Sequence, residues 1–170
     1  MVDEPSAMRG RLARLRGELA DERPIVSGLG AEIAGLAGEL ARQAPDAAQL
    51  AVAAVRIHRY YTALESVLLR VERTFAAEPA GGDWHLDLLR GATRELPGIR
   101  LAVLPRAVLD PLHEVLRFRH FFRHAYAIAL DGTKLAKVAR HVVTVHADVD
   151  AALGAFDRFL AELSERMDEE

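Results

Sequence analysis

The chain has no cysteine and almost no lysine, and both features limit its chemistry. Without cysteine, disulfides, thiol catalysis and Cys-based zinc sites are excluded. Lysine occurs only at Lys134 and Lys137, so nearly all positive charge in the 170 residues is arginine. Aromatic residues make up 6% of the sequence, and period-two runs of Val, Ile, Thr and Tyr are nearly absent. The composition therefore favours helices over strands.

Long apolar runs are also missing. No run approaches the roughly 18 residues that a membrane span requires. The opening stretch "MVDEPSAMRGR" lacks the basic-then-apolar plan of a secretory signal. Hydrophobic residues make up 51% of the chain, enough for a core at single-domain length. A net charge of -3 argues against general coating of nucleic acid. We expect a soluble cytoplasmic protein that binds neither membrane nor DNA.

The first 44 residues follow a helical pattern. Apolar side chains recur at alternating steps of four and three, a spacing that places them on one face of a helix. Pro24 lies inside this seam, but the register continues on both sides of it, which predicts one long kinked helix. Two shorter helices that break near "DERP" are the alternative. We assign residues 1–44 to an N-terminal helical arm, whose seam consists of Met8, Leu12, Leu15, Leu19, Val26, Leu29, Ile33, Leu36 and Leu40.

Residues 45–166 read as a helical bundle within a single domain that covers residues 1–170. The second helix should begin at Pro45 and stop at the turn signal "AEPAGG". Asp83 can cap a short third helix that continues to Leu96.

The fourth helix should begin at Asp110, or earlier at Pro105, and lie near residues 105–130. The breaker "LDGT" then precedes a last, long amphipathic helix. The sum is an all-α fold, an antiparallel up-and-down bundle of about five helices.

The segment "RFRHFFRHAY", residues 117–126, sets arginines and histidines among aromatic residues. Residues four or seven apart share a helix face, so this segment forms two adjacent polar stripes. One stripe contains Arg119, Arg123 and Tyr126, and the other contains Arg117, His120 and His124, preceded by His113. Phe118 and Phe122 take the apolar side. We therefore expect the aromatic residues to anchor the helix while the polar stripes face a cleft or a partner.

Such a set of side chains suits metal-free RNA cleavage. A histidine, with an ordinary pKa of about 6.5, can take the 2′-hydroxyl proton, and an arginine can stabilise the charge on the phosphorane. Arg119 and His124 lie about 140° apart around a helix, so only a long arginine or a second copy of the helix brings their heads together. The alternative is that the stripes are a solvated face or a contact between helices.

Other patterns do not complete a second site. His120 and His124 have the spacing of a helical metal pair, but no HExxH pattern or nearby carboxylate accompanies them, so we expect no metal and no cofactor. The segment "SGLG" lacks the strand that precedes a phosphate-binding loop. Four further histidines are expected to be structural: His58, His85, His141 and His146.

The basic segment resembles the signature of a known family. "RHFFRHAY" matches the R-x4-H-x-Y motif of HepT-like toxins in the HEPN superfamily, with Arg119, His124 and Tyr126 at the three fixed positions. The flanking segments "YYTALESVLLRV" and "LDGTKLAKVARHV" are also similar to those of HepT-like proteins. The resemblance spans roughly residues 50–165. It implies a five-helix bundle that forms a homodimer, in which two copies of the motif face one cleft.

The resemblance also implies a function. HepT-like toxins are metal-independent endoribonucleases of type VII-like toxin–antitoxin pairs, so RNA would be the substrate and Arg119 and His124 the catalytic residues. His120 stands where the family often has Asn, and we expect it to support RNA binding together with Arg123 and Arg117.

The family's antitoxin is a minimal nucleotidyltransferase that transfers AMP to the motif tyrosine, here Tyr126. The added nucleotide would place bulk and negative charge in the site for RNA phosphate.

Two other functions fit parts of the sequence. A non-catalytic helical HEPN adaptor would bind a nucleotidyltransferase partner without cutting RNA. A coiled-coil assembly factor would use the N-terminal seam, but this hypothesis leaves the motif unexplained.

Overall fold

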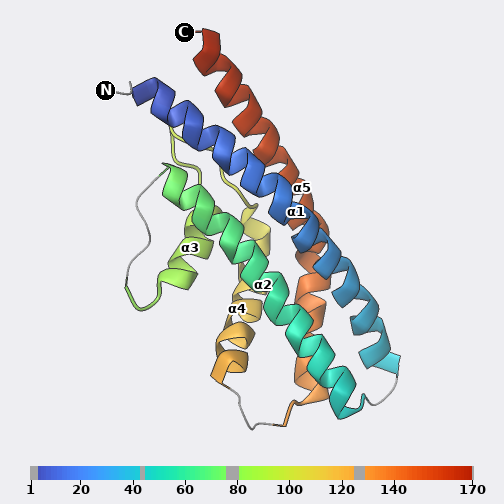
Figure 1. Ribbon diagram of the computed structural model, residues 1–170. Helices are drawn as coiled ribbons and strands as arrows, with labels where there is room; N and C mark the ends of the chain where they lie inside the picture. The colour runs from blue at the N-terminus through green and yellow to red at the C-terminus, as the bar shows by residue number, and fades with distance from the viewer. Residues whose placement is uncertain (1–3, 43–44, 76–80, 125–128, 170) are drawn as a thin grey trace.

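The computed structural model describes residues 4–42, 45–75, 81–124 and 129–169, which form an all-α bundle without strands (Figure 1). The α-helices are α1 (Glu4–Arg42), α2 (Ala47–Phe75), α3 (Trp84–Ala92), α4 (Leu109–His124) and α5 (Gly132–Glu169), and a 3-10 helix, η1 (Arg106–Val108), precedes α4. The predicted all-α fold class is therefore confirmed. None of these helices is long and apolar enough to cross a membrane, as far as the described ranges extend.

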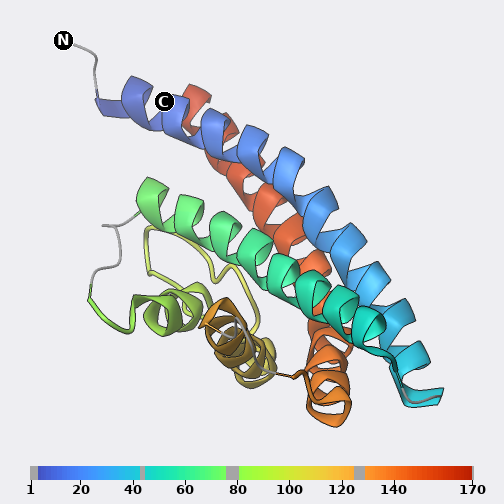
Figure 2. The same ribbon diagram turned by 60° about the horizontal axis from the view of Figure 1, so that its bottom comes forward.

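Helix α2 occupies the centre of the bundle, because it packs against each of the other four α-helices. Helices α1 and α5 lie side by side, and the N-terminal end of α1 is at the same end of the molecule as the C-terminal end of α5 (Figure 1). Helices α3 and α4 lie on the other side of α2 from α1 (Figure 2). The residues of α2 that face α4 are therefore enclosed by the fold.

Helix α1 continues through Pro24 as one helix, so the alternative of a break near "DERP" is wrong. It follows a bowed path along the bundle (Figure 2). Its seam residues are buried from Leu12 to Ile33. Arg23 pairs with Asp150 of α5 at 3.3 Å. The segment that we assigned to an arm is thus packed into the bundle, since its apolar seam needs the faces of α2 and α5 to leave water.

The starts of α2 and α5 follow local sequence signals, whereas Asp83 before α3 makes no side-chain capping bond. Asp46 and Gln49 form a capping box at the start of α2, in which each side chain accepts the other residue's backbone N–H, at 2.8 and 2.9 Å. At the start of α5, Asp131 accepts the backbone N–H of Lys134. These bonds satisfy backbone N–H groups at the start of each helix, which have no partner within the helix.

Helix α3 is shorter than predicted, because it ends at Ala92 and not at Leu96. Beyond it, the side chain of Arg100 is buried and donates to the carbonyls of Arg94, Leu101 and Gly91. Arg100 also pairs with Glu72 of α2 at 3.1 Å. These bonds hold the connection to η1 against the bundle in a non-helical path.

The helix that carries the basic segment begins as the 3-10 turn after Pro105 and becomes α-helical at Leu109, which agrees with the earlier of the two predicted starts. Its described part ends at His124, and residues 129–131 are not helical. The predicted range of 105–130 is therefore too long at its C-terminal end.

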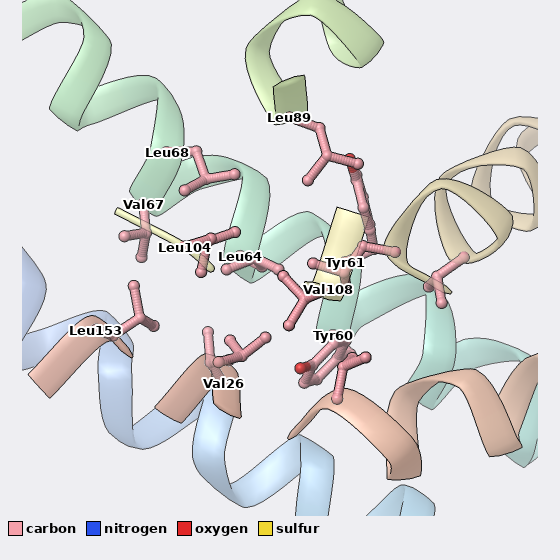
Figure 3. Packing of buried hydrophobic residues seen from close by; sticks show 14 of the residues in the cluster. Val26, Tyr60, Tyr61, Leu64, Val67, Leu68, Leu89, Leu104, Val108 and Leu153 are labelled. Carbon is pink, nitrogen blue, oxygen red and sulfur yellow. The ribbon is translucent and has the colours of Figure 1, made fainter. Parts of the chain in front are cut away.

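Apolar side chains from every layer meet in one core (Figure 3). Val26 of α1, Leu64 of α2 and Leu153 of α5 converge with Val108 of η1. Each such side chain stabilises the fold by about 1.5–3 kcal/mol relative to an exposed one. Tyr60 is fully buried in this core, and its ring meets the edge of His146 at a centroid distance of 6.0 Å.

Two glycines of α1 test this packing. His146 lies where the Cβ of an alanine at position 30 would be, whereas a Cβ at Gly28 meets nothing within 4 Å. We expect Gly30→Ala to lower the free energy of unfolding by about 1–3 kcal/mol through overpacking. Gly28→Ala should raise it by about 0.5–1 kcal/mol, because alanine favours the helix. Urea denaturation of both variants measures the difference, and equal effects would contradict this packing of His146.

Candidate functional site

The motif arginine of α4 is buried. Arg119 is 7% exposed, and its Nη2 donates to Oε2 of Glu65 on α2 at 2.8 Å. Its Nε donates to Oγ1 of Thr62 at 3.3 Å, and Thr62 lies on α2, one turn before Glu65. We expected Arg119 and Arg123 to lie on one outward-facing stripe of the helix. Arg123 is exposed, as expected, but Arg119 is buried. Arg119 turns inward because α2 offers it a buried carboxylate.

Glu65 also binds a histidine from a third helix. Its Oε1 lies 2.6 Å from Nδ1 of His85 at the start of α3. An ion-paired carboxylate only accepts hydrogen bonds, so Nδ1 of His85 carries the proton in this contact. One buried carboxylate thus joins α2, α3 and α4. We call Glu65, Arg119, His85 and the neighbouring His120 the Glu65 cluster.

Ring contacts fix the position of His85. Trp84 stacks on it with a centroid distance of 3.6 Å and an interplanar angle of 28°. The ring of His120 meets it nearly edge-on, at 4.9 Å and 73°. His120 itself is exposed, so the cluster extends from the buried carboxylate to the surface of α4. The imidazole of His85 is therefore held by a hydrogen bond and by two neighbouring rings.

Burial and the neighbouring positive charges lower the pKa of two other histidines near the site, His120 and His58. Partial burial, then His85 and Arg119, lower the pKa of His120. Burial, then Arg119 and Arg123, lower the pKa of His58, whose ring contacts Phe122. Both imidazoles are therefore largely uncharged at neutral pH and can accept a proton.

Two buried nitrogen atoms of this region have no hydrogen-bond partner among the described residues: Nη1 of Arg119 and Nδ1 of His58. Buried polar atoms without partners are uncommon in folded proteins and mark places where a ligand, a water or a second chain can supply the missing bond. One nitrogen of the guanidinium, Nη1, therefore has no hydrogen bond, although Nε and Nη2 are bound.

The other motif residues lie outside this cluster. His124 is the last described residue of α4 and is exposed. Helix α4 by itself thus does not bring Arg119 and His124 together, because one is buried against α2 and the other is at the surface. Tyr126 lies outside the described residues.

Arg117 lies on a different face of α4. It is exposed and pairs with Glu114 at 3.1 Å. It lines an open groove of about 430 Å³ between α4 and the start of α5, together with Phe121 and Lys134. Phe118 and Phe122 are half-buried and pack against the core, as we expected of the aromatic anchors.

Glu65 was not among the residues that we expected at the site, and His85 was expected to be structural. A signal for Glu65 was present, because a single acid among Leu64, Val67 and Leu68 falls on the buried face of an amphipathic helix, where a charge needs a partner. His85 had no such signal, since its contact with Glu65 joins residues 20 positions apart. In the described ranges, no group of three or more His, Asp or Glu side chains is arranged to hold a metal ion.

Removal of Glu65 should destabilise the fold strongly. The Glu65→Leu variant leaves the buried guanidinium of Arg119 without its counter-charge, which we expect to cost about 3–5 kcal/mol of unfolding free energy. Glu114→Leu removes the partner of Arg117, whose side chain is 68% exposed, and should cost about 0–1 kcal/mol.

Urea denaturation measures the free energy of unfolding of both variants. The double variant Glu65→Leu/Arg119→Met removes both charges and should recover most of the loss. A single Glu65→Leu variant as stable as Glu114→Leu would show that the buried pair does not hold α4 on α2.

Comparison with known proteins places this site in a family. Residues 52–160 match the family described as HepT-like protein, and this range contains Arg119, His124 and Tyr126. Searches of curated proteins and of solved structures find no match to the chain. The match covers more than half of the chain and agrees with the observed all-α bundle. The chain belongs to the HepT-like family of the HEPN superfamily.

Proposed function

We propose that this protein is a HepT-like toxin that cleaves RNA without a metal ion. Arg119 and His124 are the catalytic residues, and Arg117, His120 and Arg123 support RNA binding. The observation that carries the proposal is family membership over a range that includes the complete R-x4-H-x-Y motif. The chain acts as a homodimer and is silenced by a nucleotidyltransferase antitoxin.

The environment of Arg119 supports a role in binding phosphate. Glu65 and Thr62 hold the guanidinium in one orientation, so little rearrangement is needed when charge develops on a phosphorane. Its Nη1 is buried and has no partner among the described residues, so an anionic oxygen that reaches it would complete its hydrogen bonding. A preorganised donor of this kind stabilises a transition state more than a mobile surface arginine does.

The position of His124 supports the dimer. His124 is exposed at the end of α4, five residues from a buried Arg119, so a second copy of the chain is the simplest source of the missing neighbour. In the proposed reaction, His124 takes the 2′-hydroxyl proton, the 2′-oxygen attacks phosphorus, and Arg119 stabilises the negative oxygens.

The regulation that we propose acts on Tyr126. The antitoxin transfers AMP to its hydroxyl, two residues beyond His124 in the sequence. The attached phosphate brings negative charge to the end of α4 and competes with RNA phosphate for the cationic side chains there.

One observation favours a second function. Arg119 already pairs with Glu65 and is almost fully buried, as expected of an arginine that only holds two helices together. In that case the protein is a non-catalytic adaptor that binds a nucleotidyltransferase. The adaptor requires no RNA cleavage and no growth arrest, and the next experiment separates the two functions.

Cleavage should depend on His124 and not on metal. Purified protein should cut a panel of RNAs in the presence of EDTA, and His124→Ala should lower the rate by about 10²–10⁴-fold. Because His124 is exposed, this variant should fold normally. Glu165→Ala, an exposed change on α5, is the control and should cleave like the wild type. In cells, expression should arrest growth unless His124 is replaced. An intact dimer that leaves every RNA uncut would favour the adaptor.

Modification should map to Tyr126. After co-expression with the product of the adjacent gene, which we propose is the nucleotidyltransferase antitoxin, the intact protein should gain the mass of one or more AMP units, and peptide fragmentation should place them on Tyr126. Tyr126→Phe should gain no mass, because it lacks the hydroxyl that forms the phosphodiester. AMP on another residue, or no gain in mass, would contradict this regulation.

A further inference from the structure

RNA cleavage by the proposed mechanism needs two proton transfers. One group takes the proton of the 2′-hydroxyl, and another gives a proton to the 5′-oxygen when its bond to phosphorus breaks, because an alkoxide is a poor leaving group in water. The motif provides one histidine for these two tasks. Arginine cannot perform the second task, since its guanidinium does not lose its proton in proteins.

His85 has the geometry of a proton-transfer histidine. Its Nδ1 is bound to Glu65 at 2.6 Å, so Nε2 is the ring nitrogen left for a ligand. A carboxylate that binds one imidazole nitrogen fixes the tautomer and the orientation of the ring, which is how many enzymes prepare a catalytic histidine. The same carboxylate binds Arg119 at 2.8 Å, which keeps the imidazole beside the motif guanidinium.

We infer that His85 is a catalytic residue of this cleavage and that its Nε2 donates the proton to the 5′-oxygen. The inference rests on the proposed function, and it adds to the family motif a residue from α3. His85 lies 34 positions before Arg119 in the sequence and meets it only through Glu65 of α2.

The step balances without a further reactant. The 2′-oxygen forms a bond to phosphorus as His124 takes its proton, and the bond from phosphorus to the 5′-oxygen breaks as His85 gives up its Nε2 proton. For this step His85 starts with protons on both ring nitrogens, keeps the Nδ1 proton that binds Glu65, and ends as a neutral imidazole. The products are a 2′,3′-cyclic phosphate and a free 5′-hydroxyl. Water later returns the protons to the starting state, with no oxidation or reduction.

The groups around the ring are few and defined. Glu65 faces it from α2, Trp84 stacks on it from α3, and Arg119 and His120 lie beside it from α4. His85 retains 13% exposure of its side chain, and the exposed His120 adjoins it. The ring is therefore supported on its buried side and meets the surface of the molecule at α4.

A substrate with an altered leaving group tests this role. An RNA oligonucleotide that the wild type cuts at a mapped linkage is compared with the same oligonucleotide carrying sulfur in place of the bridging 5′-oxygen. A thiolate leaves without protonation, because thiols are far more acidic than alcohols. His85→Asn keeps an N–H that can donate to Glu65 but cannot transfer a proton. His141→Asn, on α5 and outside the contacts of the Glu65 cluster, is the matched control.

We expect His85→Asn to cut the normal RNA about 10²-fold or more slowly than the wild type, and the sulfur substrate within about threefold of it. The decline in rate at high pH that reports the proton donor should also disappear in this variant. His124→Ala should be slow on both substrates, and His141→Asn should match the wild type on both. Thermal unfolding confirms the fold of each variant, and His85→Gln takes the place of His85→Asn if the latter is unfolded.

The outcomes separate the inference from the function on which it rests. A wild type that cuts no RNA overturns the proposed nuclease, and the inference with it. A wild type that cuts, beside a folded His85→Asn variant that cuts the normal RNA equally well, overturns only the inference. Equal slowing on both substrates also overturns it, because His85 would then support Glu65 and not donate a proton.

Discussion

A buried ion pair between Arg119 and Glu65 sets the position of the motif helix. Removing both charges from water costs several kcal/mol per ion, so neither residue is stable inside the bundle without the other. The pair therefore allows one packing of α4 on α2 in which the oxygen of Glu65 meets Nη2 of Arg119, and a rotation of α4 that separates them leaves two uncompensated charges. Apolar contacts alone tolerate such rotations far better.

The same carboxylate determines the electrostatics of the site. Glu65 offsets the charge of Arg119, so a phosphate that approaches this region meets a guanidinium whose field is partly cancelled. Burial, then His85 and Arg119, lower the pKa of His120, so this imidazole adds little positive charge at neutral pH.

The long helices give the cluster a rigid frame. Helix α2 touches every other α-helix, and α1 and α5 pack along each other on its far side, so Glu65 lies on a helix that is held by the whole bundle. Helix α1 contributes no residue to the cluster. It instead covers the face of α2 that carries Tyr60 and Leu64 and thereby keeps that helix in place.

The sequence by itself determined the helices and their buried faces, because the period of the apolar residues and the local capping signals depend only on neighbours along the chain. It also identified the motif residues on α4. Only the tertiary structure decided that Arg119 turns inward, that Glu65 and His85 join it, and that α3 ends at Ala92. These contacts connect residues 20 to 54 positions apart, and helical periodicity carries no information about which polar side chains meet across such distances. The partner of a buried charge is set by which helices pack together, and that is decided by the tertiary structure.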